Sequence, residues 1–191
     1  MATAPLTLLT EDEYHRLERA AQFRSEFVNG QMYAMAGGTH KHSLLEVNAS
    51  SEIRALLKGS GCRVYSSNLR LRVPSGAELY PDLSVFCGPA QAYRGASDIC
   101  TNPILVVEVL SPSSANYDRG LKFELYRQIP TLRDYLVLHQ SAVFAEHHTK
   151  NPDGSWTLRE YRGEEAMIPL QGIDRTLVLG SVYEAVMDES V

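Results

Sequence analysis

Cysteine is scarce in this sequence. The 191 residues include three cysteines, and no two of them have the C-x-x-C spacing that zinc sites and redox motifs use. The common cysteine-based metal and redox centres are therefore excluded. We predict that Cys62, Cys87 and Cys100 are reduced thiols, most of them buried in the protein.

Long hydrophobic runs are also absent. A helix that crosses a bilayer needs about 20 consecutive apolar residues, whereas the longest apolar segment, residues 104–110, is interrupted by Glu108. The first nine residues have no basic region ahead of their short apolar run, and Glu11, Asp12 and Glu13 follow at once, which argues against a secretory signal. The sequence predicts a cytoplasmic protein with no membrane-spanning segment.

Positive charge is in deficit. Lysine and arginine number 18 against 23 aspartates and glutamates, which gives a formal net charge of -5. Binding to nucleic acid through charge alone requires lysines and arginines that displace counterions from phosphates. Any phosphate chemistry in this protein therefore needs a metal cation or a local basic patch.

What remains is the composition of an ordinary globular protein. The hydrophobic fraction is 44% and the charged fraction is 21%, far from the composition of disordered chains. Domains typically hold about 100–200 residues. We therefore predict one domain that spans residues 1–191.

Local patterns predict alternating helices and strands. A capping box at Thr10 indicates a helix at 11–21, Asn29-Gly30 indicates a β-hairpin, and an apolar stripe from His42 to Gly59 indicates a second helix. We expect further strands at 64–73, 83–86, 104–110, 135–138, 142–148, 156–161 and 173–179, a helix around 121–129 and a short one capped by Ser181. The strands at 83–86 and 104–110 are apolar on both sides, as central strands covered on both faces are. The fold class is α/β with a mixed sheet.

Glu108 stands where the strand pattern calls for an apolar residue. It lies between Val107 and Val109, and an ionised carboxylate on a doubly covered strand costs several kcal/mol unless it is paired or binds a cation. Asp82 precedes the other central strand. Two carboxylates at one end of a sheet supply the oxygen ligands that Mg²⁺ and Mn²⁺ prefer.

Lys122 is a third element of this pattern. It follows Glu108 by 14 residues (122 − 108) in the first turns of a predicted helix, and Asp118 precedes it by four. Asp118 can cap that helix, and Lys122 can reach the strand ends and stabilise negative charge there. The residues alone leave a second interpretation open, in which Glu108 and Lys122 form a structural ion pair and Asp82 only caps a turn.

A family resemblance rests on the order and spacing of several segments. Residues 80–85 read Tyr-Pro-Asp-Leu-Ser-Val, residues 105–114 read Leu-Val-Val-Glu-Val-Leu-Ser-Pro-Ser-Ser, and Asp118, Lys122, Tyr126 and residues 134–137 follow. This series resembles the Uma-two-like family of putative restriction endonucleases, within the PD-(D/E)XK nuclease superfamily. The hairpin at residues 26–30 and the helix led by His42 also resemble the family's opening pattern.

The resemblance implies a restriction-endonuclease-like fold, with a mixed central β-sheet flanked by helices and additional β-hairpins, and it implies roles for residues. Asp82 and Glu108 are then metal ligands, helped by the Val109 carbonyl, and the metal is Mg²⁺ or Mn²⁺. Leu110 stands where the superfamily usually has its catalytic lysine, so Lys122 supplies that amine from the next helix. Glu26, His42 and Asp118 are accessory candidates, and Ser111, Ser113 and Arg119 are candidates for phosphate binding.

Other polar residues favour structural interpretations. His40 and His42 point different ways on a helix, and His147 and His148 face opposite sides of a strand. Ser111 has no G-x-S-x-G motif around it. The remaining candidates are structural or solvated: Arg70 and Arg72 are expected on a solvated strand face, and Trp156 in the core or at an interface.

The sequence therefore predicts a metal-dependent endonuclease that hydrolyses DNA phosphodiester bonds. Cutting both strands of a duplex needs two sites, so we also expect a homodimer, with the hairpin at 23–35 as a contact. Two alternatives stay open: a catalytically silent nuclease fold that acts as a binding or assembly module, and an unrelated α/β protein with a buried ion pair.

Overall fold

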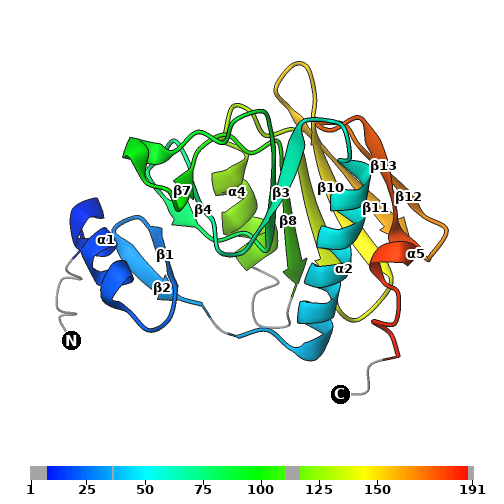
Figure 1. Ribbon diagram of the computed structural model, residues 1–191, viewed down its shortest axis with the longest axis horizontal. Helices are drawn as coiled ribbons and strands as arrows, with labels where there is room; N and C mark the ends of the chain where they lie inside the picture. The colour runs from blue at the N-terminus through cyan, green and yellow to red at the C-terminus, as the bar shows by residue number, and fades with distance from the viewer. Residues whose placement is uncertain (1–7, 36, 111–116, 189–191) are drawn as a thin grey trace, which may run out of the picture.

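A six-stranded mixed sheet forms the centre of the fold (Figure 1), seen in a computed structural model that describes residues 8–35, 37–110 and 117–188. The strand order is β11-β10-β9-β8-β6-β3. β8 and β9 are parallel, and the other neighbours are antiparallel. The strands are β3 (Cys62–Ser66), β6 (Leu83–Cys87), β8 (Leu105–Leu110), β9 (Asp134–His139), β10 (Phe144–Lys150) and β11 (Trp156–Arg162). The predicted mixed sheet is confirmed.

Alternation along β8 separates two hydrophobic clusters. Leu105, Val107 and Val109 pack into the cluster on one face, and Val106 and Leu110 pack into the cluster on the other. Since successive side chains of a strand point to opposite faces, the glutamate between Val107 and Val109 lies on the second face. Both faces are covered, as the apolar character of the strand predicted.

The first face is covered by α2 (His40–Leu56), which contributes the buried Leu45, Ala49 and Ile53 to the core. Beside α2 lie the two-stranded sheet of β12 (Met167–Leu170) and β13 (Arg175–Val178) and the short helix α5 (Leu179–Val182) (Figure 1).

The second face is covered by a π-helical turn, η2 (Asp118–Lys122), by α4 (Phe123–Tyr126) and by residues of a five-stranded sheet. That sheet has the order β2-β1-β5-β4-β7, and α1 (Glu11–Ala20) packs against it through the buried Tyr14. The strands are β1 (Ser25–Val28), β2 (Gln31–Ala34), β4 (Arg70–Arg72), β5 (Glu78–Leu79) and β7 (Ile99–Cys100), and a 3-10 turn, η1 (Tyr93–Gly95), precedes β7. In Figure 1 the β1–β2 hairpin and α1 lie at the end of the molecule opposite α5.

Two predicted local features match the structure closely. Thr10 accepts from the Glu13 backbone and the Glu13 side chain accepts from the Thr10 backbone, so the capping box begins α1 as expected. Asn29 and Gly30 have φ values of 51° and 79°, and β1 and β2 pair directly on either side of them. Positive φ at both positions is the requirement that Asn-Gly meets at low cost.

The helix expected around 121–129 differs in form. Its first turn is π-helical, and α4 ends at Tyr126. β12 was not predicted, and α5 begins at Leu179, ahead of the predicted Ser181 cap. The π turn places Asp118 and Lys122 side by side, and π-helical insertions commonly occur at functional sites.

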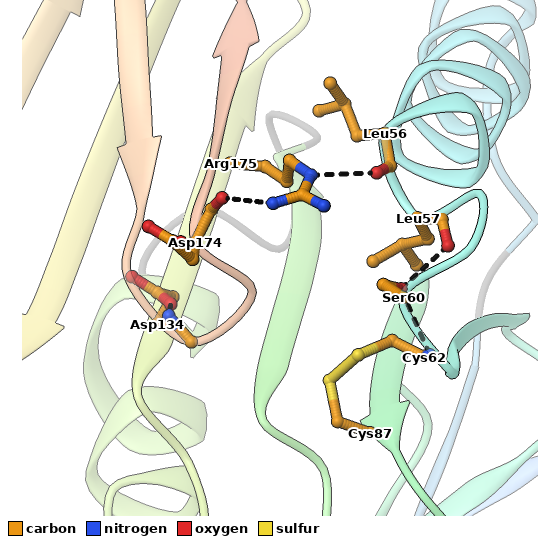
Figure 2. The surroundings of a disulfide bond; sticks show 9 residues. Leu56, Leu57, Ser60, Cys62, Cys87, Asp134, Asp174 and Arg175 are labelled. Atoms are coloured by element: carbon orange, nitrogen blue, oxygen red, sulfur yellow. Dashed lines mark hydrogen bonds between the residues drawn. A yellow bond between two sulfur atoms is a disulfide. The ribbon is translucent and has the colours of Figure 1, made fainter.

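The cysteine prediction is wrong for two of three residues. Cys62 and Cys87 form a disulfide between β3 and β6 (Figure 2), whereas Cys100 is free and buried as predicted. The antiparallel register places Cys62 opposite Cys87 although 25 residues separate them. Sequence spacing carried no sign of that pairing. Figure 2 also shows the Ser60 side chain closing the turn between α2 and β3 through the Leu57 carbonyl and the Cys62 amide.

The prediction of a solvated arginine face on β4 is also wrong. The Arg70 side chain is buried and forms ion pairs with Glu78 and Asp98, and Arg72 pairs with Glu11 and Glu78. Both arginines lie between α1 and the five-stranded sheet, where charge requires partners. Trp156 packs against the core, as predicted. Within the described ranges, no helix is long and apolar enough to span a bilayer.

Candidate functional site

A cleft of about 610 Å³ opens at the carboxyl end of β8, between α2, β1 and η2. We call it the central cleft. Its lining includes most of the candidate residues named from the sequence: Glu26, His42, Asp82, Glu108, Val109, Asp118 and Lys122. They come from five separate elements or their ends, so the fold brings together side chains that are up to 96 residues apart (122 − 26).

Glu108 is buried in the wall of this cleft, with 2% of its surface exposed. Both of its carboxylate oxygens accept from Lys122 Nζ, at 3.1 and 3.2 Å, and Oε1 also accepts from the Tyr126 hydroxyl at 3.1 Å. Lys122 and Tyr126 are i and i+4 on the helical segment that covers the second face of the sheet. The carboxylate interrupting the strand therefore has partners, as its burial requires.

Lys122 forms ion pairs with more than one carboxylate. Its Nζ lies 3.2 Å from Glu26 Oε1 and 3.5 Å from Asp118 Oδ1, and it donates to the Tyr80 carbonyl at 3.4 Å. Burial acts to lower the pKa of Lys122, but the charges of Glu108, Glu26 and Asp118 outweigh it, and the pKa lies well above its usual value of 10.5. Lys122 is therefore a permanent cation shared by three acids.

Asp82 is held at the start of β6 by two contacts. Its Oδ2 accepts from the Val109 amide at 2.6 Å, and its Oδ1 lies 3.2 Å from His42 Nε2. The Val109 contact joins Asp82 to the residue directly after Glu108. The two acidic residues predicted as metal ligands thus line one cleft and lie close enough for Asp82 to raise the pKa of Glu108.

Glu46 is a site residue that the sequence reasoning missed. His42 and Glu46 lie one helical turn apart on α2. One imidazole nitrogen of His42, one carboxylate oxygen of Glu46 and one of Asp82 all lie within 4.8 Å of one another. Burial and Asp82 raise the pKa of Glu46. The i, i+4 spacing was visible in the sequence, but nothing showed that this face of the helix meets Asp82.

Glu26 is placed by its neighbours. Tyr117 donates to Glu26 Oε2 at 2.7 Å, and the Tyr80 amide donates to Oε1 at 3.0 Å. Glu26 is almost fully buried on β1 and shares Lys122 with Glu108. Its accessory position, expected from the family resemblance, is therefore next to the proposed metal ligands.

The phosphate-binding candidates have different outcomes. Arg119 is directed to Glu146, at 2.7 Å, and to His139, and it is not part of the central cleft lining among the described residues. Ser111 and Ser113 lie outside the described residues. The Asp118 carbonyl accepts from the Tyr135 hydroxyl at 2.8 Å, which fixes the π turn beneath the cleft.

The central cleft holds more negative than positive charge. Burial raises the pKa of Glu108 well above its usual value of 4.5; Lys122 lowers that pKa, and Asp82, Asp118 and Glu26 raise it. One lysine faces four carboxylates, and a buried carboxylate in that position needs a proton or a further cation. The donor atoms are carboxylate oxygens, with one imidazole, and they fit a hard divalent ion such as Mg²⁺ or Mn²⁺.

The electrostatics predict how stability depends on pH. The pKa of Glu108 in the folded protein lies above its usual value of 4.5. Glu108 therefore contributes to the free energy of unfolding at pH values below the pKa of the unfolded chain, and this contribution is lost as the pH rises through the folded-state pKa. A Glu108→Gln variant cannot titrate there. In EDTA, the free energy of unfolding of the variant minus that of the wild type should therefore increase from pH 5 to pH 9, as measured by urea unfolding. A difference that stays constant or decreases over this range would contradict the assignment.

Comparison with known proteins now places the chain. The family model described as "Uma2: Putative restriction endonuclease" matches residues 11–179, which include every described residue of the central cleft. The chain belongs to the Uma2 family. The family resemblance predicted from the sequence is confirmed, and the alternative of an unrelated α/β protein is excluded.

Two relatives and one solved structure are also similar to this Uma2 chain. Uncharacterized protein slr1290 of Synechocystis sp. is 35% identical over 95% of this chain and 94% of its own, and uncharacterized protein sll1609 of the same organism is 34% identical over 88% and 96%. The crystal structure of a putative nuclease belonging to DUF820 from Anabaena variabilis is similar with a TM-score of 0.74 and 17% identity, over 92% of this chain and 97% of that one. The restriction-endonuclease-like fold is thereby confirmed.

Proposed function

We propose that this Uma2 protein is a metal-dependent endonuclease that hydrolyses phosphodiester bonds in DNA. One observation carries the proposal: Asp82, Glu108 and Lys122, each an expected catalytic residue, line one cleft. Lys122 contacts Glu108 directly, and Asp82 accepts from the amide of Val109, the residue after Glu108. A buried ion pair with a purely structural role would not require an excess of carboxylates around a single lysine.

Asp82 and Glu108 would hold the divalent ion, together with the Val109 carbonyl, and His42 and Glu46 are available as additional donors. Bound there, such an ion neutralises charge on the phosphate and lowers the pKa of the attacking water.

Lys122 acts in this proposal as a fixed cation. Its raised pKa keeps the amine protonated, so it stabilises negative charge that develops on the phosphate and does not accept a proton. Tyr126 and Lys122 both donate to Glu108 and orient its carboxylate toward the cleft. Glu26 keeps Lys122 in place from the opposite side.

We further propose a homodimer, since cleavage of both strands needs two active sites. The β1–β2 hairpin supports this proposal, because β2 is an edge strand and the neighbouring Phe23 and Tyr33 are exposed. Exposed edges and large apolar side chains are common features of protein interfaces.

The test of the function is a divalent-ion titration with purified protein and supercoiled plasmid. We expect nicked and linear products with Mg²⁺ or Mn²⁺ and no products in EDTA. Single-stranded DNA and RNA serve as comparison substrates. Metal binding is monitored as an increase in Tm. If the protein binds divalent ions but cleaves none of these substrates with any of them, the proposal is rejected and a catalytically silent binding module is favoured.

A further inference from the structure

A second cleft lies along α1. It has a volume of about 720 Å³ and is formed by one face of α1 and by η1 and the residues that follow it. Three exposed arginines line it: Arg16 and Arg19 from α1, and Arg94 from η1. We call it the arginine cleft.

The acids around this cleft neutralise its arginines only in part. Among the described residues, Arg16 and Arg19 form no ion pair within 4.0 Å, and Arg94 pairs only with Glu11, at 3.2 Å. Glu11 also pairs with Arg72, at 2.7 Å. Asp12 is the one carboxylate in the lining, so three guanidinium groups face one acid.

Ion pairs beneath the cleft account for part of the nearby negative charge. Glu78 lies under α1 and contacts His15 at 2.8 Å, Arg72 at 2.9 Å and Arg70 at 3.3 Å. Asp98 pairs with Arg70. Since these acids already have cationic partners, the exposed Arg16 and Arg19 are available to an outside anion, and Arg94 shares Glu11 with Arg72.

The position of Arg94 is set by the backbone. Arg94 has a φ of 47° and Gly95 a φ of 76°, so the chain turns in the left-handed region, which costs a non-glycine residue about 1 kcal/mol or more. The turn places the Arg94 guanidinium across from Arg16 and Arg19. Tyr93 lies beside it, with its ring 5.1 Å from the Arg94 guanidinium carbon.

The two clefts are close neighbours. The Tyr80 hydroxyl donates to Glu18 Oε1 at 3.0 Å; Tyr80 lines the central cleft, and Glu18 directly precedes Arg19 on α1. One side-chain contact therefore connects the wall of the central cleft to the helix that carries Arg16 and Arg19.

We propose that the arginine cleft binds the phosphate backbone of duplex DNA. Charge complementarity supports this partner, because three arginines and one carboxylate line the cleft and guanidinium groups match phosphate geometry. Arg119, the phosphate-binding candidate from the sequence, is already paired with Glu146. This inference rests on the proposed function, since the DNA is taken to be the polymer that the central cleft cleaves.

The test is the salt dependence of binding to a labelled 30-base-pair duplex in EDTA, where no cleavage interferes. The variant is Arg16→Gln, Arg19→Gln and Arg94→Asn combined, since glutamine suits a helix and asparagine tolerates a left-handed backbone. Each phosphate contact contributes about 0.9 to the slope of log K against log salt concentration. We expect the slope to decrease in magnitude by about 2–3 units and binding at about 50 mM salt to weaken by at least tenfold.

A matched control removes the same charge elsewhere. Three arginines, Arg54, Arg127 and Arg159, are exposed, lie outside the arginine cleft and form no ion pair among the described residues. Their combined replacement by glutamine should give the same slope of log K against log salt concentration as the wild type. Equal slopes for the two triple variants would overturn the proposal, as would wild-type protein that does not bind the duplex. Competition by millimolar inorganic phosphate with full loss of DNA binding would indicate a small-anion site and overturn it as well.

The outcomes also separate this proposal from the nuclease function. If the cleft variant loses DNA binding while the wild type never cleaves DNA, the binding surface stands and the nuclease proposal fails. If the wild type cleaves DNA and the cleft variant binds it like the control, the binding surface is rejected and the nuclease proposal stands.

Discussion

Replacing Glu108 by glutamine should reduce divalent-ion-dependent cleavage of plasmid DNA by about 10³-fold or more, because the loss of one charged group at a reacting phosphate removes several kcal/mol of transition-state stabilisation. Glutamine has nearly the same shape and still accepts from Lys122 and Tyr126. The protein should therefore fold. Thermal unfolding in EDTA at pH 8 should show a Tm at least as high as that of the wild type, because burial raises the pKa of Glu108 and its ionisation at this pH costs the wild type stability.

The same variant should lose most of the increase in Tm that Mg²⁺ or Mn²⁺ gives the wild type, because it removes one proposed ligand. Glu124→Gln is the matched control, since Glu124 lies on α4 near Lys122 but is exposed. It should keep both the cleavage activity and the metal-dependent increase in Tm. A Glu108→Gln variant that cleaves like the wild type would reject the role of Glu108.

Replacing Lys122 by methionine should destabilise the metal-free protein by about 3–5 kcal/mol, the usual cost of leaving a buried charge without its partner. Glu108, Glu26 and Asp118 all lose their shared cation in this variant. At about 2–4 °C per kcal/mol for a chain of this size, the Tm should fall by about 6–20 °C. Cleavage should be lost as well.

Divalent ions distinguish this electrostatic cause from a packing defect. The unbalanced carboxylates of the Lys122→Met variant should bind cations, so Mg²⁺ or Mn²⁺ should raise its Tm by more degrees than the Tm of the wild type. Lys58→Met, at an exposed position, should leave stability and activity near those of the wild type. If metal ions raise the Tm of the Lys122→Met variant and of the wild type equally, the carboxylates around Lys122 do not need its charge for balance.

The elements that carry these residues were largely predictable from the sequence, because each has a local signal. The capping box at Thr10, the turn at Asn29-Gly30 and the doubly apolar β8 are read from neighbouring residues alone. Glu108 was found as a candidate for the same reason, since a charge in an apolar strand is a local contradiction. Errors of boundary, such as the π turn at η2, arose where packing on the sheet overrode helical periodicity.

Contacts between distant segments were not predictable in this way. The disulfide of Cys62 with Cys87 depends on the register of β3 and β6, and the burial of Arg70 depends on the packing of α1 over the five-stranded sheet. Glu46 joined the site because α2 crosses the sheet with that face toward Asp82. None of these four residues, Cys62, Cys87, Arg70 and Glu46, stands out in its own sequence neighbourhood.

The sequence by itself determined the α/β class and the central strands, since hydrophobic periodicity and turn chemistry are short-range properties. It also indicated Asp82, Glu108 and Lys122 as candidate site residues. Only the tertiary structure decided which cations those acids share, that Arg119 is directed to Glu146, and that Arg16, Arg19 and Arg94 line one cleft. Electrostatic interactions act through space between groups far apart in the chain. Their sign at any site is therefore set by how the elements pack, and the scarcity of positive charge in the sequence does not extend to the arginine cleft.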